Sequence, residues 1–118
     1  MIVEKTVSFD AAHQLKGYDG PCGRVHGHRF SVSVGVKGDV KSSGMIFDFA
    51  KLKKWMNKNI VDVFDHTLIN DTIENPTAEN IALWIVDKFQ RDFVNDITIE
   101  LAYVKVWETP DSMVEWRP

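Results

Sequence analysis

Residues 28–37, HRFSVSVGVK, alternate between apolar and polar side chains along most of their length. A period of two is typical of a β-strand that buries one face and exposes the other. One face of this stretch would carry four apolar side chains, and the opposite face small or charged ones: Phe30, Val32, Val34 and Val36, against Arg29, Ser31, Ser33 and Lys37. The stretch therefore predicts a half-buried strand.

Three further strands are predicted, one before this stretch and two after it. Residues 2–11 also alternate, and His13 continues the parity of their apolar side chains. Residues 97–107 alternate again through Ile99, Leu101, Tyr103 and Trp107. A short last strand is expected over residues 113–116, after the turn-forming residues 110–112.

Two helices are predicted between the second and third strands. Asp48 is a plausible N-cap for a helix whose apolar positions follow helical spacing: Phe49, Leu52, Met56, Ile60 and Val63. Pro76 and Thr77 open a second helix, which should end near Asn95 and which has its own apolar stripe: Ala82, Val86, Phe89 and Phe93.

The predicted order is ββααββ, which makes the chain an α+β protein with a four-stranded antiparallel sheet and two helices on one face. At 118 residues with 44% hydrophobic content, residues 1–118 are expected to form one domain. Two helices cover only one face of such a sheet, so self-association is the simplest way to protect the other face and the edges. We therefore expect an oligomer.

The composition argues against several classes of partner. The formal net charge is -3 and the pI is about 5.7, which gives no general electrostatic reason to bind nucleic acid or an anionic membrane. No apolar run approaches the length of a membrane span. A cytoplasmic protein without a nucleic-acid or membrane partner is expected, and the single cysteine excludes an internal disulfide.

The stretch CGRVHGHRF, residues 22–30, holds that cysteine and two of the four histidines. His26 and His28 leave one face of the strand with about 6.6 Å of rise between them, and His13 would enter the same space if the first two strands pair antiparallel. Three protein ligands on rigid strands are typical of a catalytic zinc site, although iron, nickel or cobalt also suit imidazole. The alternative is that the histidines are ordinary polar residues at a strand edge.

Six short motifs, taken together and in this order, resemble the 6-pyruvoyltetrahydropterin synthase family: FDAAH, CGRVHGH, GMIFDFAKLK, FDHTLIND, NPTAEN and WET. The cysteine four residues before HGH is similar to the compact spacing of the 6-carboxy-5,6,7,8-tetrahydropterin synthase branch. The resemblance implies the tunnelling fold (T-fold), in which trimers form a barrel and two trimers stack into a homohexamer with active sites between subunits. It also implies that His13, His26 and His28 bind Zn²⁺.

The same resemblance implies roles for five more residues. Cys22 would act as the catalytic base, and the pair Asp65 and His66 would carry a proton. Glu108 would anchor the pterin ring, because a carboxylate accepts two parallel hydrogen bonds, and Thr77 would also touch the pterin. Read singly, four of these residues have a simpler alternative: a fourth zinc ligand for Cys22, turn residues for the pair, and a surface carboxylate for Glu108.

The activity implied is zinc-dependent carbon-oxygen lyase chemistry on a small-molecule substrate, 7,8-dihydroneopterin triphosphate. Its products would be 6-carboxy-5,6,7,8-tetrahydropterin, acetaldehyde and triphosphate, on the path to queuosine. The triphosphate needs basic partners, for which Lys16, Arg24 and Arg29 are candidates. Two alternatives remain: 6-pyruvoyltetrahydropterin synthase activity, and a non-catalytic T-fold scaffold with a structural zinc.

Overall fold

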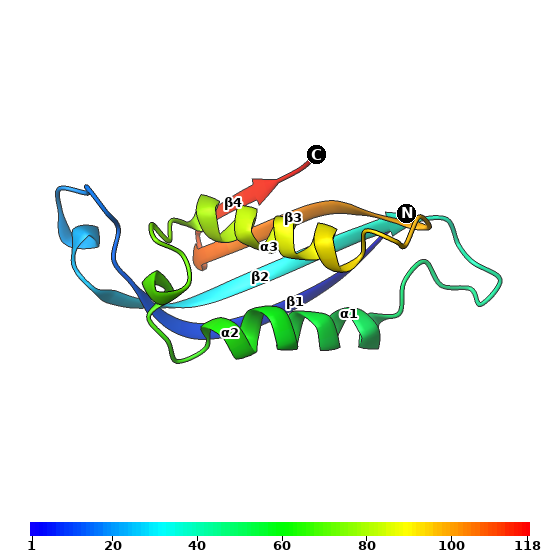
Figure 1. Cartoon of the computed structure of the whole chain (residues 1–118), viewed down its shortest axis with the longest axis horizontal. Helices are drawn as coiled ribbons and strands as arrows, with labels where there is room; N and C mark the ends of the chain where they lie inside the picture. The colour runs from blue at the N-terminus through cyan, green and yellow to red at the C-terminus, as the bar shows by residue number, and fades with distance from the viewer.

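A four-stranded antiparallel sheet runs through the molecule, as a computed structural model of residues 1–118 shows (Figure 1). Its strands are β1 (Ile2–His13), β2 (His26–Gly38), β3 (Ile99–Thr109) and β4 (Ser112–Trp116), and they lie in the order β1-β2-β3-β4. The predicted α+β fold class and strand order are confirmed. The strand β3 begins two residues later than predicted, and β2 begins two residues earlier, so that it includes His26.

The first predicted helix is present and contains an irregularity. It consists of α1 (Phe49–Met56), a π-helical turn η2 (Asn57–Val61) and α2 (Asp62–Phe64). The predicted cap is correct, because the side chain of Asp48 accepts a hydrogen bond from the backbone N–H of Ala50 at 2.7 Å. The π turn holds one extra residue per turn and was not indicated by the apolar spacing.

The second predicted helix is α3 (Ala78–Asp92), which ends three residues before the expected Asn95. Thr77 is its N-cap, and its side-chain oxygen accepts a hydrogen bond from the N–H of Asn80 at 3.1 Å. Two short 3₁₀ turns, η1 (Pro21–Gly23) and η3 (Ile69–Asp71), lie in the connecting loops.

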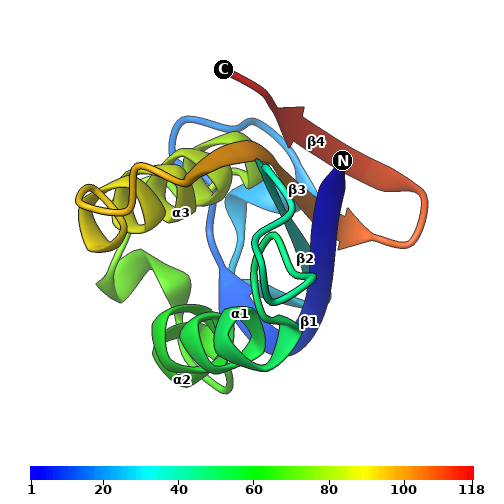
Figure 2. The same ribbon diagram turned by 90° about the vertical axis from the view of Figure 1, so that its right-hand side faces the viewer.

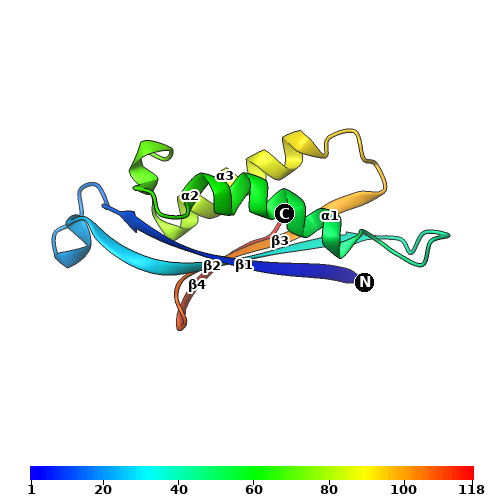
Figure 3. The ribbon, with the colours of Figure 1, turned by 90° about the horizontal axis from the view of Figure 1, so that it is seen from below.

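Both long helical segments lie on the same side of the sheet (Figures 2 and 3). The helix α1 packs against β1, and α3 packs against β3 and β4. The four apolar side chains predicted for the buried face of residues 28–37 have no exposed surface and form the centre of the core. No helix covers the other face of the sheet, which we call the helix-free face (Figure 3). None of the helices has both the length and the apolar character needed to cross a bilayer.

One prediction about side-chain orientation in β3 is wrong. Gly35 pairs with Tyr103 and the next residue of β2 pairs with Leu101, so Ala102 is an extra residue that forms a β-bulge. The bulge reverses the alternation, which places Tyr103 and Trp107 on the helix-free face. Val104 takes the core position instead and is fully buried.

The molecule is elongated, with extents of 53 × 26 × 25 Å. The loop of residues 14–25 lies at one end of the long sheet and the loop of residues 39–48 at the other (Figure 1). Because β1 ends and β2 begins at the first of these loops, the candidate site residues of both strands lie at that end.

Candidate metal centre and active site

The histidines of β1 and β2 form one cluster. In the antiparallel register His13 lies opposite His26, and His28 lies opposite Ala11. Side chains two residues apart on one strand share a face, so all three imidazoles project to the same side. One nitrogen from each ring lies within 4.8 Å of the others. The structure therefore brings together the three residues predicted as metal ligands.

Backbone carbonyls fix the orientation of two of these rings. His13 Nδ1 lies 2.8 Å from the carbonyl oxygen of Pro76, and His26 Nδ1 lies 2.7 Å from that of Arg24. A carbonyl oxygen only accepts hydrogen bonds, so each Nδ1 carries a hydrogen, and in the neutral ring each Nε2 then presents a lone pair. The Nδ1 contacts are those that commonly orient a metal-binding histidine.

The third ring supplies the clearest sign that the cluster suits a cation. His28 Nε2 is buried and has no hydrogen-bond partner. Burial lowers the pKa of His28, although the nearby carboxylate of Glu108 opposes this. A neutral imidazole with an unpaired, inward-facing nitrogen suits a cation better than a proton. The three-histidine donor set thus fits a divalent metal ion such as zinc.

Glu108 lies beside this cluster within the same chain. Its two carboxylate oxygens are 3.5 Å from His28 Nε2 and 3.8 Å from His13 Nε2. A second register shift, between Trp107 and Thr109, makes Glu108 the extra residue of a bulge at the end of β3. Bulges of this kind redirect a side chain, and here the carboxylate lies half-buried near the histidines.

Cys22 lies outside the histidine cluster. It sits in the 3₁₀ turn η1, is partly exposed, and its backbone carbonyl accepts a hydrogen bond from the N–H of Leu15 at 3.1 Å. Its sulfur is not among the atoms that gather around the three imidazoles. The chain on its own therefore does not build the closed four-ligand site considered as an alternative for Cys22.

The side chains of Asp65 and His66 contact each other directly, although the two residues are adjacent. His66 has a positive φ of 58°, and its Nδ1 lies 2.8 Å from Asp65 Oδ2. Asp10 of β1 holds the pair: its N–H donates to Asp65 Oδ1 at 2.9 Å, and its carbonyl accepts from the N–H of His66 at 2.7 Å. The hydrogen bond from the Asp10 backbone is the largest cause of a lowered pKa for Asp65, and the hydrogen bond to His66 lowers that pKa further.

The same pair is open to solvent and lies near the histidine cluster. The side chain of His66 is 79% exposed, and His66 and His28 both line one shallow hollow of about 600 Å³. This exposure leaves the imidazole free to contact a substrate or a second subunit. Thr77, in contrast, uses its side-chain oxygen to cap α3.

Sequence reasoning missed the residues that hold the His13 end of β1 in place. The side chain of Asn70 makes a reciprocal pair with the backbone of Gln14, accepting at 2.9 Å and donating at 2.8 Å. Asn75 Oδ1 accepts a hydrogen bond from the backbone N–H of Lys16 at 3.0 Å. An asparagine in a polar loop is typical of turns, so its side chain gave no sign of this role, and the Pro76 carbonyl has no sequence signal at all.

The candidate cations for the triphosphate differ in their surroundings. Lys16 forms an ion pair with Glu74 at 2.7 Å. Arg24 lines a small hollow in the loop that carries Cys22. Arg29 lies on β2 next to His28, and its guanidinium is 3.2 Å from the carboxylate of Asp10.

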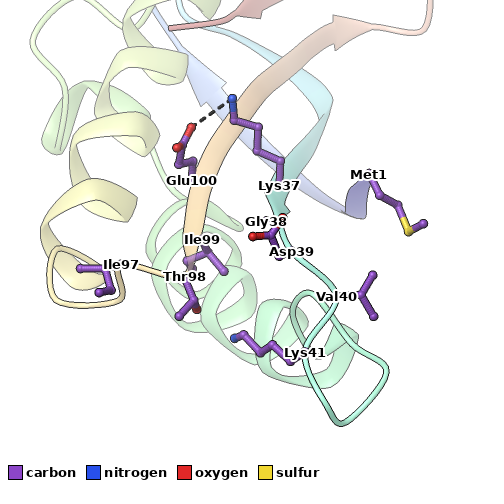
Figure 4. Close-up of a pocket in the computed structure, with 10 residues that line it drawn as sticks. All are labelled: Met1, Lys37, Gly38, Asp39, Val40, Lys41, Ile97, Thr98, Ile99 and Glu100. Carbon is purple, nitrogen blue, oxygen red and sulfur yellow. Dashed lines mark ion pairs between the residues drawn. The ribbon is translucent and has the colours of Figure 1, made fainter.

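Another hollow, of about 590 Å³, lies at the opposite end of β2 (Figure 4). Lys37 and Glu100 form an ion pair of 3.0 Å at its edge. Its lining contains lysines, carboxylates and exposed apolar side chains, but neither a histidine nor a cysteine. The histidines and the cysteine therefore lie away from this hollow.

The fold and the motif set agree with comparison to known proteins. A family model described as 6-pyruvoyl tetrahydropterin synthase matches residues 2–118. The chain belongs to this family. The predicted family resemblance is thereby confirmed, and the match covers all of the site residues discussed above.

Individual relatives of this chain carry three different activities in their names. A 6-carboxy-5,6,7,8-tetrahydropterin synthase of Haemophilus influenzae is 31% identical over 141 residues, which cover 98% of this chain and 97% of the relative. A dihydroneopterin monophosphate aldolase of Pyrococcus furiosus is 40% identical over 108 residues, covering 92% and 90%. The solved structure of Caenorhabditis elegans 6-pyruvoyl tetrahydropterin synthase superposes with a TM-score of 0.85 at 29% identity, covering 100% of this chain and 95% of that one. The chain is therefore an enzyme of the tetrahydropterin synthase type with the T-fold.

Proposed function

We propose that this protein is a zinc-dependent 6-carboxy-5,6,7,8-tetrahydropterin synthase. It would convert 7,8-dihydroneopterin triphosphate and water to 6-carboxy-5,6,7,8-tetrahydropterin, acetaldehyde and triphosphate, as a step toward queuosine in the cytoplasm. The observation that carries the proposal is the cluster of His13, His26 and His28, in which the buried Nε2 of His28 has no partner. The named activity of the Haemophilus influenzae relative supplies the reaction.

The proposed roles follow from where each side chain lies. The three Nε2 atoms would hold Zn²⁺, which as a Lewis acid makes hydroxyl and carbon acids easier to deprotonate. Cys22 would remove a proton from the substrate side chain. His66, oriented by Asp65 at 2.8 Å, would pass a proton to or from the substrate. Glu108 would bind the pterin ring, with support from the Thr77 region, and its position beside the histidines would place that ring next to the metal.

The unpaired edges of the sheet favour an oligomer. The segment of residues 65–68 covers the edge of β1 only at Asp10 and Ala12, so the rest of β1 and the outer edge of β4 have no partner strand within the chain. Unpaired strand edges commonly pair with another chain. We propose a homohexamer built as two trimers, in which residues 1–118 act as one domain and His66 of one subunit approaches the cluster of the next. Native mass spectrometry tests this, and a monomer at micromolar concentration would contradict it.

The decisive experiment is product analysis. Zinc-loaded protein would be incubated with 7,8-dihydroneopterin triphosphate, and the products separated by mass spectrometry with trapping of acetaldehyde. A 6-carboxytetrahydropterin product with one equivalent of acetaldehyde is expected. A 6-pyruvoyl product would instead assign the alternative synthase activity.

Two controls separate the remaining possibilities. The 40% identity to a dihydroneopterin monophosphate aldolase makes the monophosphate a necessary second substrate, and its cleavage in preference to the triphosphate would reassign the chain. Unchanged substrates in both assays, with metal bound, would favour the non-catalytic scaffold.

A further inference from the structure

Gly27 has no explanation within the chain itself. The strand β2 contains three glycines, Gly27, Gly35 and Gly38. A Cβ at Gly35 would overlap the ring of Tyr103, and one at Gly38 would overlap a backbone oxygen, so these two glycines are required by close packing. A Cβ at Gly27 would meet only one atom within 4 Å, the backbone oxygen of Ala11 at 3.6 Å, and Gly27 does not have a positive φ.

A glycine in a strand that the fold does not require usually marks the close approach of a ligand or another backbone. Gly27 alternates with His26 and His28, so it faces the opposite side of β2, on the helix-free face. Two hollows lie there, of about 660 Å³ and about 600 Å³. Both are lined by Gly27, His28 and Arg29. The two hollows therefore meet at the place where a side chain at position 27 would lie.

Most residues that line the larger hollow have polar side chains, and they include two carboxylates, Glu4 and Glu108, as well as Arg29. Only one of its eleven residues, Trp107, is hydrophobic. The hydroxyls of Thr6, Ser31 and Ser33 lie along it, and those of Ser31 and Ser33 pair with hydroxyls on β1 at 2.9 Å and 2.6 Å. Hydroxyl groups of this kind can also donate hydrogen bonds to the oxygens of a ligand.

Arg29 is the cation at the junction of the two hollows. Its side chain is 70% exposed and that of its partner, Asp10, is 53% exposed. An exposed ion pair of this kind is weak, so the guanidinium can leave Asp10 for a stronger anion. Its planar fork of N–H donors matches the oxygens of a phosphate group.

We propose that Arg29 binds the phosphate chain of the substrate in the space above Gly27. The proposal rests on the proposed function for the identity of the ligand, whereas the anion site itself rests on the geometry of β2. It selects Arg29 from the three candidate cations, because neither Lys16 nor Arg24 lines the two hollows beside Gly27, and Arg24 lines a separate hollow. It also accounts for a glycine between the two metal-binding histidines of β2.

Fluorescence titration of the zinc-loaded, full-length protein with neopterin triphosphate and with neopterin tests the proposal. These oxidised pterins are fluorescent and differ only in the phosphates. Arg29→Gln should weaken binding of neopterin triphosphate by about 10- to 100-fold, the loss expected for a charge-assisted hydrogen bond, and should leave neopterin unaffected. Arg91→Gln, an identical change in a pair with Asp87 on α3, is the matched control.

Two more variants probe the geometry. Gly27→Ala should keep the melting temperature, because its methyl group makes only an ordinary contact, but should weaken binding of neopterin triphosphate at least fivefold. Asp10→Asn should tighten it, since the competing carboxylate is removed while the backbone contacts to Asp65 and His66 stay.

Three results would overturn the proposal. They are equal affinity for neopterin triphosphate in Arg29→Gln and wild type, a loss found in Arg24→Gln instead, and a Gly27→Ala protein that changes oligomeric mass while keeping its affinity. Calorimetry with inorganic triphosphate, with the zinc content checked afterwards, separates this proposal from the proposed function. If neither pterin binds but inorganic triphosphate binds in an Arg29-dependent way, the proposed function fails and the anion site stands. If no phosphate compound binds, the anion site is wrong.

Discussion

His13 Nε2 lies 3.0 Å from His26 Nε2, although each ring has already committed its Nδ1 hydrogen to a backbone carbonyl. Two nitrogens that face each other without a hydrogen between them repel through their lone pairs. A third, buried nitrogen on His28 also lacks a partner. The bare cluster is therefore unfavourable, and a cation that all three nitrogens share would relieve it.

Removal of the metal should accordingly lower stability. A metal present at about 1,000 times its dissociation constant stabilises the folded state by about 4 kcal/mol, which corresponds to a melting temperature higher by roughly 10 °C or more in a domain of this size. Scanning fluorimetry before and after chelation measures this, and added zinc should restore the original value. A protein stripped of metal with an unchanged melting temperature would contradict it.

The metal-free protein should also lose stability in mild acid. Burial lowers the pKa of His28 below the ordinary histidine value of about 6.5, so the unfolded chain takes up a proton before the folded chain does. Stability is then fully present above about pH 6.5 and falls as the pH drops through the lower folded pKa. Melting temperatures of the chelated protein between pH 8 and pH 5 test this. His28→Asn should flatten the decline, and an equally steep decline in that variant would assign the effect to other groups.

Much of the fold could be predicted because alternation and helical spacing report directly on burial. The four apolar side chains predicted for the buried face of residues 28–37 are all core residues. The N-cap Asp48 was predicted correctly, and the second helix begins directly after the predicted Thr77. The orientation of Tyr103 was wrong because one extra residue, Ala102, reverses the alternation of β3. A β-bulge depends on the register between two strands, and a single strand's pattern does not contain it.

In the candidate site, too, some features follow from the sequence pattern and others depend on contacts between distant segments. The convergence of His13 with His26 and His28 followed from parity and antiparallel pairing alone. The support from the Pro76 carbonyl and from Asn70 depends on a loop that folds back onto the end of β1, and loop paths have no periodic signal. Roles that involve two subunits, as proposed for His66, lie beyond what one chain's sequence or structure determines.

Cys22→Ala should separate catalysis from metal binding. Because the thiol lies outside the histidine cluster, the variant should keep one metal per chain and the melting temperature of the wild type. Loss of a catalytic base should lower kcat by about 100-fold or more. Metal analysis and steady-state kinetics on the same preparation provide both readouts. Cys22→Ser is the matched variant, because it keeps the size of the side chain but is a much weaker acid; loss of metal in both would show that the sulfur is a ligand.

His66 offers a test in which backbone and side-chain effects separate. Its φ of 58° lies in the left-handed region, where glycine is unstrained and alanine is disfavoured by about 1 kcal/mol or more. His66→Gly should therefore be more stable than His66→Ala by about 1 kcal/mol in urea unfolding with equal m values, while both variants lose turnover equally because both lack the imidazole. Equal stabilities would mean that residues 65–68 relax when the side chain is removed. In that case the direct contact between Asp65 and His66, and not the hydrogen bonds of the backbone to Asp10, would hold this segment in its left-handed conformation.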